Sequence, residues 1–155
     1  MKRKYPASMK DKKLLAVYED FCKEIFIEPK KWTADSTMTM FGDQLYRTPE
    51  EMVDFKRLRV LRPGLQMGEF KKNRFEPSQA LAMALQMSEY DKIINLPVSD
   101  ERVVKYLKGE TLDFENENDY QDGWNLFCVD GYPLGWGKYS KGALKNKYLA
   151  GWRWQ

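Results

Sequence analysis

Residue types that commonly do chemistry are sparse in this sequence. Its 155 residues include no histidine, which removes the commonest general base and zinc ligand and the Ser-His and Cys-His nucleophile pairs. Cys22 lies on an apolar helical face and Cys128 in an apolar strand-like run, which is typical of buried, inert thiols. Acid pairs at 50/51 and 115/117 are better read as solvated groups at a helix start and in an acidic loop. The sequence therefore predicts no catalytic residue, no metal site and no cofactor site.

Charge is distributed unevenly along the chain, although the formal net charge is only +3. Residues 56–74 hold seven cations and one acid, and residues 138–155 hold five cations and no acid. Residues 110–122, in contrast, hold six acids and no cation. Such segregation indicates two basic surfaces that attract phosphate, with solvated loops as the alternative interpretation.

Aromatic residues alternate with the cations of the C-terminal segment. Tyr132, Trp136, Tyr139 and Tyr148 are followed by tryptophans at 152 and 154. Cations supply phosphate contacts and rings supply stacking surfaces for unpaired bases, so the combination is typical of RNA binding. The alternative is that the rings fill the core of a small β barrel, and for Trp136, between two glycines, core packing is favoured.

The elements that position these residues can be predicted from apolar spacing and turn residues. In the first part we expect a helix over 12–26, a hairpin of 37–41 with 44–47, and a helix that starts at Thr48-Pro49. We then expect a strand pair, 57–62 with 65–70, joined by Pro63-Gly64. A basic loop over 69–78 should lead into a helix over 77–88.

A second unit is expected to follow a boundary near residue 92. Ser99 is expected to cap a helix that reaches about Leu107 and stops at Gly109. Residues 124–129 read as a strand, and Asp130-Gly131 is a hairpin signal because glycine reaches positive φ without steric cost. Glycines on both sides of Trp136 should bend the returning strand and allow a close approach. The order of elements predicts an α+β fold.

Two long strings resemble a known family. Gly123-Trp124, residues 129–138, reading VDGYPLGWGK, and Leu144-Lys145-Asn146 resemble the PUA-like domain at the C-terminus of RsmF-type ribosomal RNA methyltransferases, in the Nol/Nop/Sun family of RNA cytosine-5 methyltransferases. Residues 58–77, reading LRVLRPGLQMGEFKKNRFEP, and residues 41–46 resemble the first C-terminal domain of that family. After Asn146 the chain departs from the family pattern, which has His-Tyr-Pro-Lys-Gly where this chain has residues 147–151, KYLAG.

The resemblance implies a small mixed α/β unit over residues 1–92, with 1–10 frayed, followed by a PUA-like β pseudo-barrel with one or two helices over 93–155. It implies no enzyme in this chain, because neither cysteine stands in the family's Pro-Cys or Thr-Cys context: Cys22 follows Phe21 and Cys128 follows Phe127. S-adenosylmethionine is expected only in a full-length parent. The partners expected are small-subunit ribosomal RNA and a methyltransferase catalytic domain, in cis or in trans.

The RNA contacts are expected on cations of both segments and on one ring: Arg59, Arg62, Lys71, Lys72, Arg74, Tyr132, Lys138, Lys145, Lys147 and Arg153. Two other functions stay open, a protein-interaction module that docks on a catalytic partner and a free-standing RNA-binding regulator. No apolar run of signal-peptide or membrane-span length is present, so we expect a cytoplasmic protein without a membrane partner.

Overall fold

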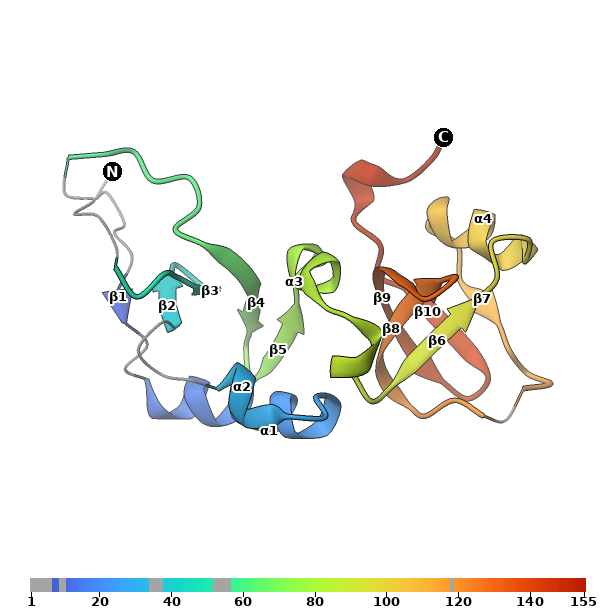
Figure 1. Ribbon diagram of the computed structural model, residues 1–155, viewed down its shortest axis with the longest axis horizontal. Helices are drawn as coiled ribbons and strands as arrows, with labels where there is room; N and C mark the ends of the chain where they lie inside the picture. Colours follow the sequence, from blue (N-terminus) through green and yellow to red (C-terminus); the bar gives the residue numbers. More distant parts are fainter. Residues whose placement is uncertain (1–6, 9–10, 34–37, 52–56, 118) are drawn as a thin grey trace. The chain divides into compact units, whose positions relative to one another are not determined.

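A computed structural model describes residues 7–8, 11–33, 38–51, 57–117 and 119–155 of the chain (Figure 1). It divides into two compact units, Met1–Leu81 and Ala82–Gln155. The division falls inside helix α3, Gln79–Ala84. The boundary expected after residue 92 lies later in the chain, just before the first strand of the second sheet. No helix among the described residues is long and apolar enough to cross a membrane.

The first unit contains the predicted N-terminal helix. Helix α1, Lys12–Ile25, starts at Asp11, whose carboxylate accepts hydrogen bonds from the backbone N–H groups of Lys13 and Leu14 at 2.9 and 3.3 Å. Its buried side chains recur at helical spacing (Tyr18, Phe21, Cys22, Ile25), which confirms the amphipathic pattern. A short helix, α2, covers Pro29–Trp32, and the Tyr18 hydroxyl donates to the Trp32 carbonyl at 2.8 Å.

The sheet of the first unit is antiparallel throughout and has the order β1-β2-β3-β4-β5. Its strands are β1 Ala7–Ser8, β2 Met38–Phe41, β3 Gln44–Arg47, β4 Leu65–Lys71 and β5 Arg74–Pro77. The hairpin predicted around Gly42-Asp43 is confirmed, because β2 pairs with β3 across that turn.

Two predictions on either side of β4 were wrong. Residues 57–62 form no strand, and β4 pairs with β3 and β5 instead. The alternation of residues 57–62 predicted a half-buried strand, but Leu58 and Leu61 are 55% and 73% exposed. The apolar residues of this segment therefore do not form a buried face. The expected basic loop over 69–78 is the β4–β5 hairpin, in which Phe70 pairs with Phe75.

The remaining predicted helix of this region is shorter than expected. The pattern over 77–88 yields α3 and then a 3-10 helix, Met87–Glu89. The helix expected from Thr48 is not formed at 48–51, and residues 52–56 lie outside the described part of the chain.

The second unit is a sheet that curls into a half-barrel with one α-helix (Figure 1). The strand order is β6-β8-β9-β10-β7, and the β6–β8 pair is parallel while the others are antiparallel. The strands are β6 Ile93–Leu96, β7 Leu112–Asp113, β8 Gly123–Val129, β9 Tyr132–Ser140 and β10 Ala143–Asn146. A 3-10 helix, Ala150–Trp152, follows them. The predicted α+β class is confirmed.

Helix α4 of this unit spans Glu101–Leu107 and lies near the predicted place. Its cap is Asp100, whose carboxylate accepts from the Arg102 backbone N–H at 2.9 Å, and not the predicted Ser99. The chain leaves the helix through Gly109 at φ +82°, as expected of a glycine that ends a helix.

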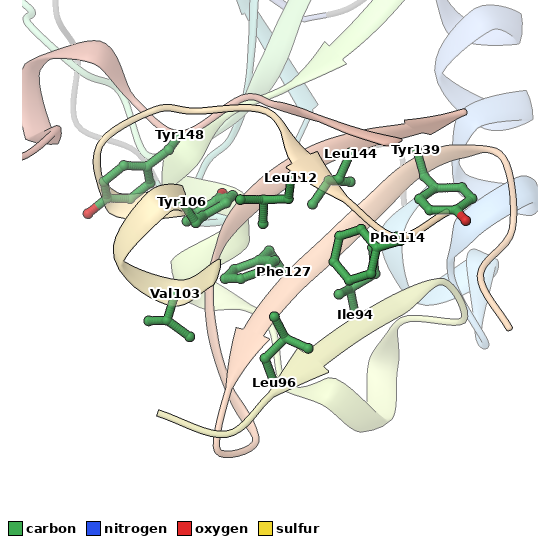
Figure 2. Packing of buried hydrophobic residues seen from close by; sticks show 10 residues of the cluster. All are labelled: Ile94, Leu96, Val103, Tyr106, Leu112, Phe114, Phe127, Tyr139, Leu144 and Tyr148. Atoms are coloured by element: carbon green, nitrogen blue, oxygen red, sulfur yellow. The ribbon is translucent and has the colours of Figure 1, made fainter. Parts of the chain in front are cut away.

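The core of the second unit lies inside the curled sheet. Figure 2 shows its side chains pointing towards one another from β6, β8, β9, β10 and α4. Phe127 lies at the centre and stacks on Tyr106 of α4, with ring centroids 4.0 Å apart. The core comprises Ile94, Leu96, Val103, Tyr106, Leu112, Phe114, Phe127, Tyr139, Leu144 and Tyr148. The α-helix and the strands are therefore joined by one apolar cluster.

The β8–β9 hairpin forms as its turn residues predict. Asp130 and Gly131 both have positive φ, 48° and 87°, as a tight two-residue turn requires. A register shift between Phe127 and Cys128 bends the pair opposite Gly135 and Pro133. Trp136 is 1% exposed, which confirms the interpretation as a core residue.

Gly137 provides the close approach expected of β9. A Cβ at this position would collide with the side chain of Leu144 on the neighbouring strand. The Leu144 side chain can thus lie directly over the backbone of β9 inside the half-barrel.

Candidate nucleic-acid interface

Three residues of neighbouring strands form a row across the sheet of the second unit. Trp124 of β8 pairs with Lys138 of β9, and Lys138 pairs with Lys145 of β10. Directly opposed residues point to the same face of a sheet. Next to them Tyr139 and Leu144 point into the core, so the row lies on the outer face.

A third cation reaches the same ring from the segment after β10. The Lys147 ammonium lies 5.7 Å from the centroid of the Trp124 ring, and the Lys138 ammonium lies 6.0 Å from it. Both separations are within the range of cation–π attraction. We call Lys138, Lys145 and Lys147 the lysine strip. Lys138 and Lys145 are exposed, and Lys147 and Trp124 are partly buried.

The lysine strip has no counter-charge among the residues that the structure describes. None of its three ammonium groups forms an ion pair within 4.0 Å of a described carboxylate. Like charges directly opposite one another destabilise a sheet. The cross-strand pair of Lys138 and Lys145 is therefore a local cost to the fold, and an anion bound between the two side chains would remove it.

The Trp124 ring, at one end of the row, is held in place by a buried ring on the same face of the sheet. The Trp124 ring meets the buried Trp136 ring edge to face, with centroids 6.5 Å apart and an interplanar angle of 82°. Trp136 packs in turn against Tyr90, with ring centroids 5.2 Å apart. The Tyr90 hydroxyl also donates to the Trp124 carbonyl at 3.2 Å. The backbone and the ring of Trp124 are thus both supported.

Asn146 positions the segment that carries Lys147. Its buried amide donates to the carbonyls of Tyr106 and Glu110 at 2.8 and 3.0 Å and accepts from the Tyr148 backbone N–H at 2.8 Å. The Lys147 backbone N–H donates to the Trp136 carbonyl at 3.0 Å. The chain beyond β10 is therefore tied to α4 and β9, which keeps the Lys147 side chain beside the ring.

Two other predicted residues of this unit lie elsewhere. Tyr132 is 77% exposed at the start of β9, six residues and about 20 Å of extended strand from Lys138. The Arg153 guanidinium donates to the Tyr148 carbonyl at 3.2 and 3.1 Å, which gives this cation a structural partner. The structure does not bring either residue to the lysine strip.

The predicted residues of the first unit fall into two groups. The Lys71 ammonium lies 2.6 Å from Glu69 and 2.8 Å from Glu76, and its pKa is raised by the hydrogen bond to Glu69 and then by that to Glu76. Its charge is therefore already compensated. The other four are exposed: Lys72 and Arg74 at the tip of the β4–β5 hairpin, and Arg59 and Arg62 in the irregular segment before β4.

The two thiols of the chain are buried and not activated for chemistry. Burial raises the pKa of both thiols, Cys22 and Cys128, to about 12, so neither supplies a nucleophile at neutral pH. No group of three or more potential metal ligands occurs among the described residues. Nor do the described elements fit a nucleotide cofactor, because their one parallel strand pair is far from a doubly wound sheet.

Trp124 is the member of the interface that sequence reasoning missed. It reads in sequence as the apolar start of a strand, and only the pairing with Lys138 places it among cations. The alternation of exposed and buried residues in β9 would have given a partial signal, because it places Lys138 on the face opposite Tyr139.

The half-barrel sheet and its helix have the architecture of a PUA-like domain. Residues 94–154 match the family model of the methyltransferase RsmF PUA domain, and residues 20–85 match that of the RsmF rRNA methyltransferase first C-terminal domain. The chain therefore belongs to the RsmF family of rRNA methyltransferases, and the two matched domains are non-catalytic C-terminal domains of that family. A comparison with curated proteins found no match.

Proposed function

We propose that this chain binds structured RNA, namely small-subunit ribosomal RNA, and positions it for a cytosine-5 methyltransferase domain. The observation that carries the proposal is the cross-strand pair of Lys138 and Lys145 without a counter-charge. The family assignment supports a methyltransferase-associated role. S-adenosylmethionine binds the catalytic domain in this scheme, and the residues of this chain contact RNA alone.

Physical reasoning favours phosphate as the group that the strip binds. Lys138 and Lys145 project from paired strands, Lys147 projects from a segment tied to them, and lysine binds phosphate as a point charge. Each phosphate neutralised releases condensed counterions, so that affinity falls steeply with salt. A polyanionic backbone also removes the repulsion between the lysines, which a single exposed carboxylate on a protein partner would do only in part.

Salt-dependent RNA titration tests the proposal. The full chain is titrated with a small-subunit rRNA fragment at several salt concentrations and compared with the triple variant Lys138→Gln, Lys145→Gln, Lys147→Gln. A plot of log affinity against log salt concentration should be less steep for the triple variant than for the wild type. The difference in slope should be roughly 0.9 for each phosphate contact removed. A matched control is Lys105→Gln, since Lys105 is a cation of the same unit that Glu101 already pairs at 3.2 Å. Equal slopes and affinities for wild type and triple variant would contradict the proposal.

A second function is favoured by the exposed rings of the C-terminal tail. Trp152 and Trp154 are 51% and 56% exposed, and Leu149 beside them is 45% exposed. Such a cluster suits docking on a protein partner, here the catalytic domain. Calorimetry with an RsmF-type catalytic domain would detect this role, and substitution of both tryptophans by serine should abolish the heat of binding while RNA affinity is kept.

A further inference from the structure

We infer that Trp124 is a stacking platform for one unpaired base of the bound RNA, with the phosphates on either side held by Lys138 and Lys147. The inference rests on the proposed RNA-binding function and adds a ligand class to it: a single-stranded or extruded nucleotide in place of a continuous duplex. The second unit would then read the difference between paired and unpaired RNA at this point.

The first support is the rigidity of the ring. Trp136 is 1% exposed and contacts the Trp124 ring edge to face, while Tyr90 holds the Trp124 carbonyl. An aromatic side chain that is fixed before binding loses little conformational freedom when a base stacks on it. The ring remains partly exposed, so that a base can reach it.

The second support is the position of the two ammonium groups. At 5.7 and 6.0 Å from the ring centroid they lie at the outer limit of cation–π attraction and hold no described carboxylate. A phosphate offers each ammonium a stronger, charge-assisted hydrogen bond. The lysines can therefore turn from the ring to the phosphates, and a base takes their place over the ring.

The third support is the combination itself. Duplex RNA exposes its phosphates and keeps its bases stacked inside the helix. A lysine strip that bound only the phosphates of a duplex would therefore have no use for an aromatic ring. Proteins that bind unpaired nucleotides combine a cationic track with aromatic surfaces. In the described part of the second unit, Trp124 is the ring that two strip lysines approach.

The experiment uses the full chain and three RNA probes of equal length: a single strand, the same strand with abasic nucleotides, and a blunt duplex. The wild type should bind the single strand about tenfold more tightly than the abasic strand, because stacking of one base contributes roughly this factor. Trp124→Leu should bind both strands alike, at the level of the abasic strand. Trp124→Phe, which keeps a ring, should restore most of the preference.

A second readout separates stacking from a general loss of fold. The chain has five tryptophans, and the indole N–H signal of Trp124, assigned from the variant, should shift with the single strand and stay in place with the abasic strand. Trp154→Leu is the matched control, since Trp154 is exposed and no strip lysine approaches it in the structure. This control should keep the preference for the single strand.

The possible failures are distinguishable. If the wild type binds all three probes with equal affinity and the Trp124 signal does not move, the stacking inference is wrong while RNA binding by the strip stands. If none of the three probes binds at low salt, the proposed RNA-binding function itself is wrong. A duplex bound more tightly than the single strand would also overturn the inference.

Discussion

A substitution in the cross-strand pair of Lys138 and Lys145 should change the stability of the fold and its affinity for RNA in opposite directions. Lys145 is the better of its two members to change, because Lys138 also approaches the Trp124 ring. Lys145→Glu replaces a repulsive pair by an attractive one on the same exposed face. The variant should raise the unfolding free energy of the second unit and weaken RNA binding at the same time.

The magnitude follows from the geometry of the sheet. Opposed side chains bring their charges to about 6 Å, where two unit charges in water interact by about 0.7 kcal/mol. Reversal of one sign changes the interaction by about twice that amount, and screening at about 0.1 M salt leaves a gain of about 0.8 kcal/mol. For a unit of this size the gain corresponds to a rise in melting temperature of about 3–6 °C.

Calorimetric unfolding of the full chain at low salt and at about 1 M salt, where the Debye length is about 3 Å, measures this gain. The stabilisation by Lys145→Glu should largely vanish in high salt. Lys138→Glu should gain less, because it also loses the ring contact. The double variant Lys138→Glu, Lys145→Glu restores repulsion and should gain nothing over the wild type. If Lys145→Glu lowers the melting temperature, or if its effect is the same at both salt concentrations, the reasoning from charge repulsion is refuted.

Three further predictions concern the framework. Asn146→Ala should cost about 1–3 kcal/mol of unfolding free energy, because the buried Tyr148 N–H loses its acceptor and the carbonyls of Tyr106 and Glu110 each lose a donor; chemical denaturation measures this, and a loss below about 0.5 kcal/mol would contradict it. Gly137→Ala should cost about 1–3 kcal/mol of unfolding free energy, because the added Cβ collides with the Leu144 side chain. In a protein that already carries Leu144→Ala, the same substitution should cost less, because the colliding side chain is shorter. Stability should fall as pH rises above about 9, because the buried thiols of Cys22 and Cys128 keep their protons to about 12 when folded while the unfolded chain releases them. The Cys22→Ser, Cys128→Ser variant should show a flatter decline in pH-dependent unfolding.

Much of the fold was predictable where the signal is local. The Asp130-Gly131 turn and the helix over 12–26 are determined by residues within a few positions of one another, and both are confirmed. The family followed from long matching strings and is confirmed by the family matches. The α+β class followed from the order of elements and is confirmed by the two sheets and their helices. Local chemistry of the backbone therefore sufficed for the turn and the helix.

Predictions failed where pairing between distant residues decides the outcome. The alternation of residues 57–62 is as regular as that of a strand, yet β4 takes β3 as its neighbour and leaves Leu58 and Leu61 exposed. The cations around 71–74 led to the prediction of a loop where the chain forms a hairpin. The pairing of Phe70 with Phe75 across that hairpin is known only from the strand register. Trp124 was missed for the same reason. Composition identified the basic segments, but only the sheet shows which side chains share a face.

The placement of Lys138 and Lys145 on paired strands determines what the lysine strip can contribute. Lys138 and Lys145 extend from paired backbone whose opposite face is packed by Tyr139 and Leu144, so their Cα positions are fixed before RNA binds. In the first unit, Lys72 lies in the turn of a hairpin, and arginines 59 and 62 lie in an irregular segment, where ordering costs more entropy. Fixed cations discriminate between arrangements of phosphates, whereas mobile cations attract any polyanion. We therefore expect the strip of the second unit to determine which RNA is preferred, and the cations of the first unit to raise affinity for all RNAs alike.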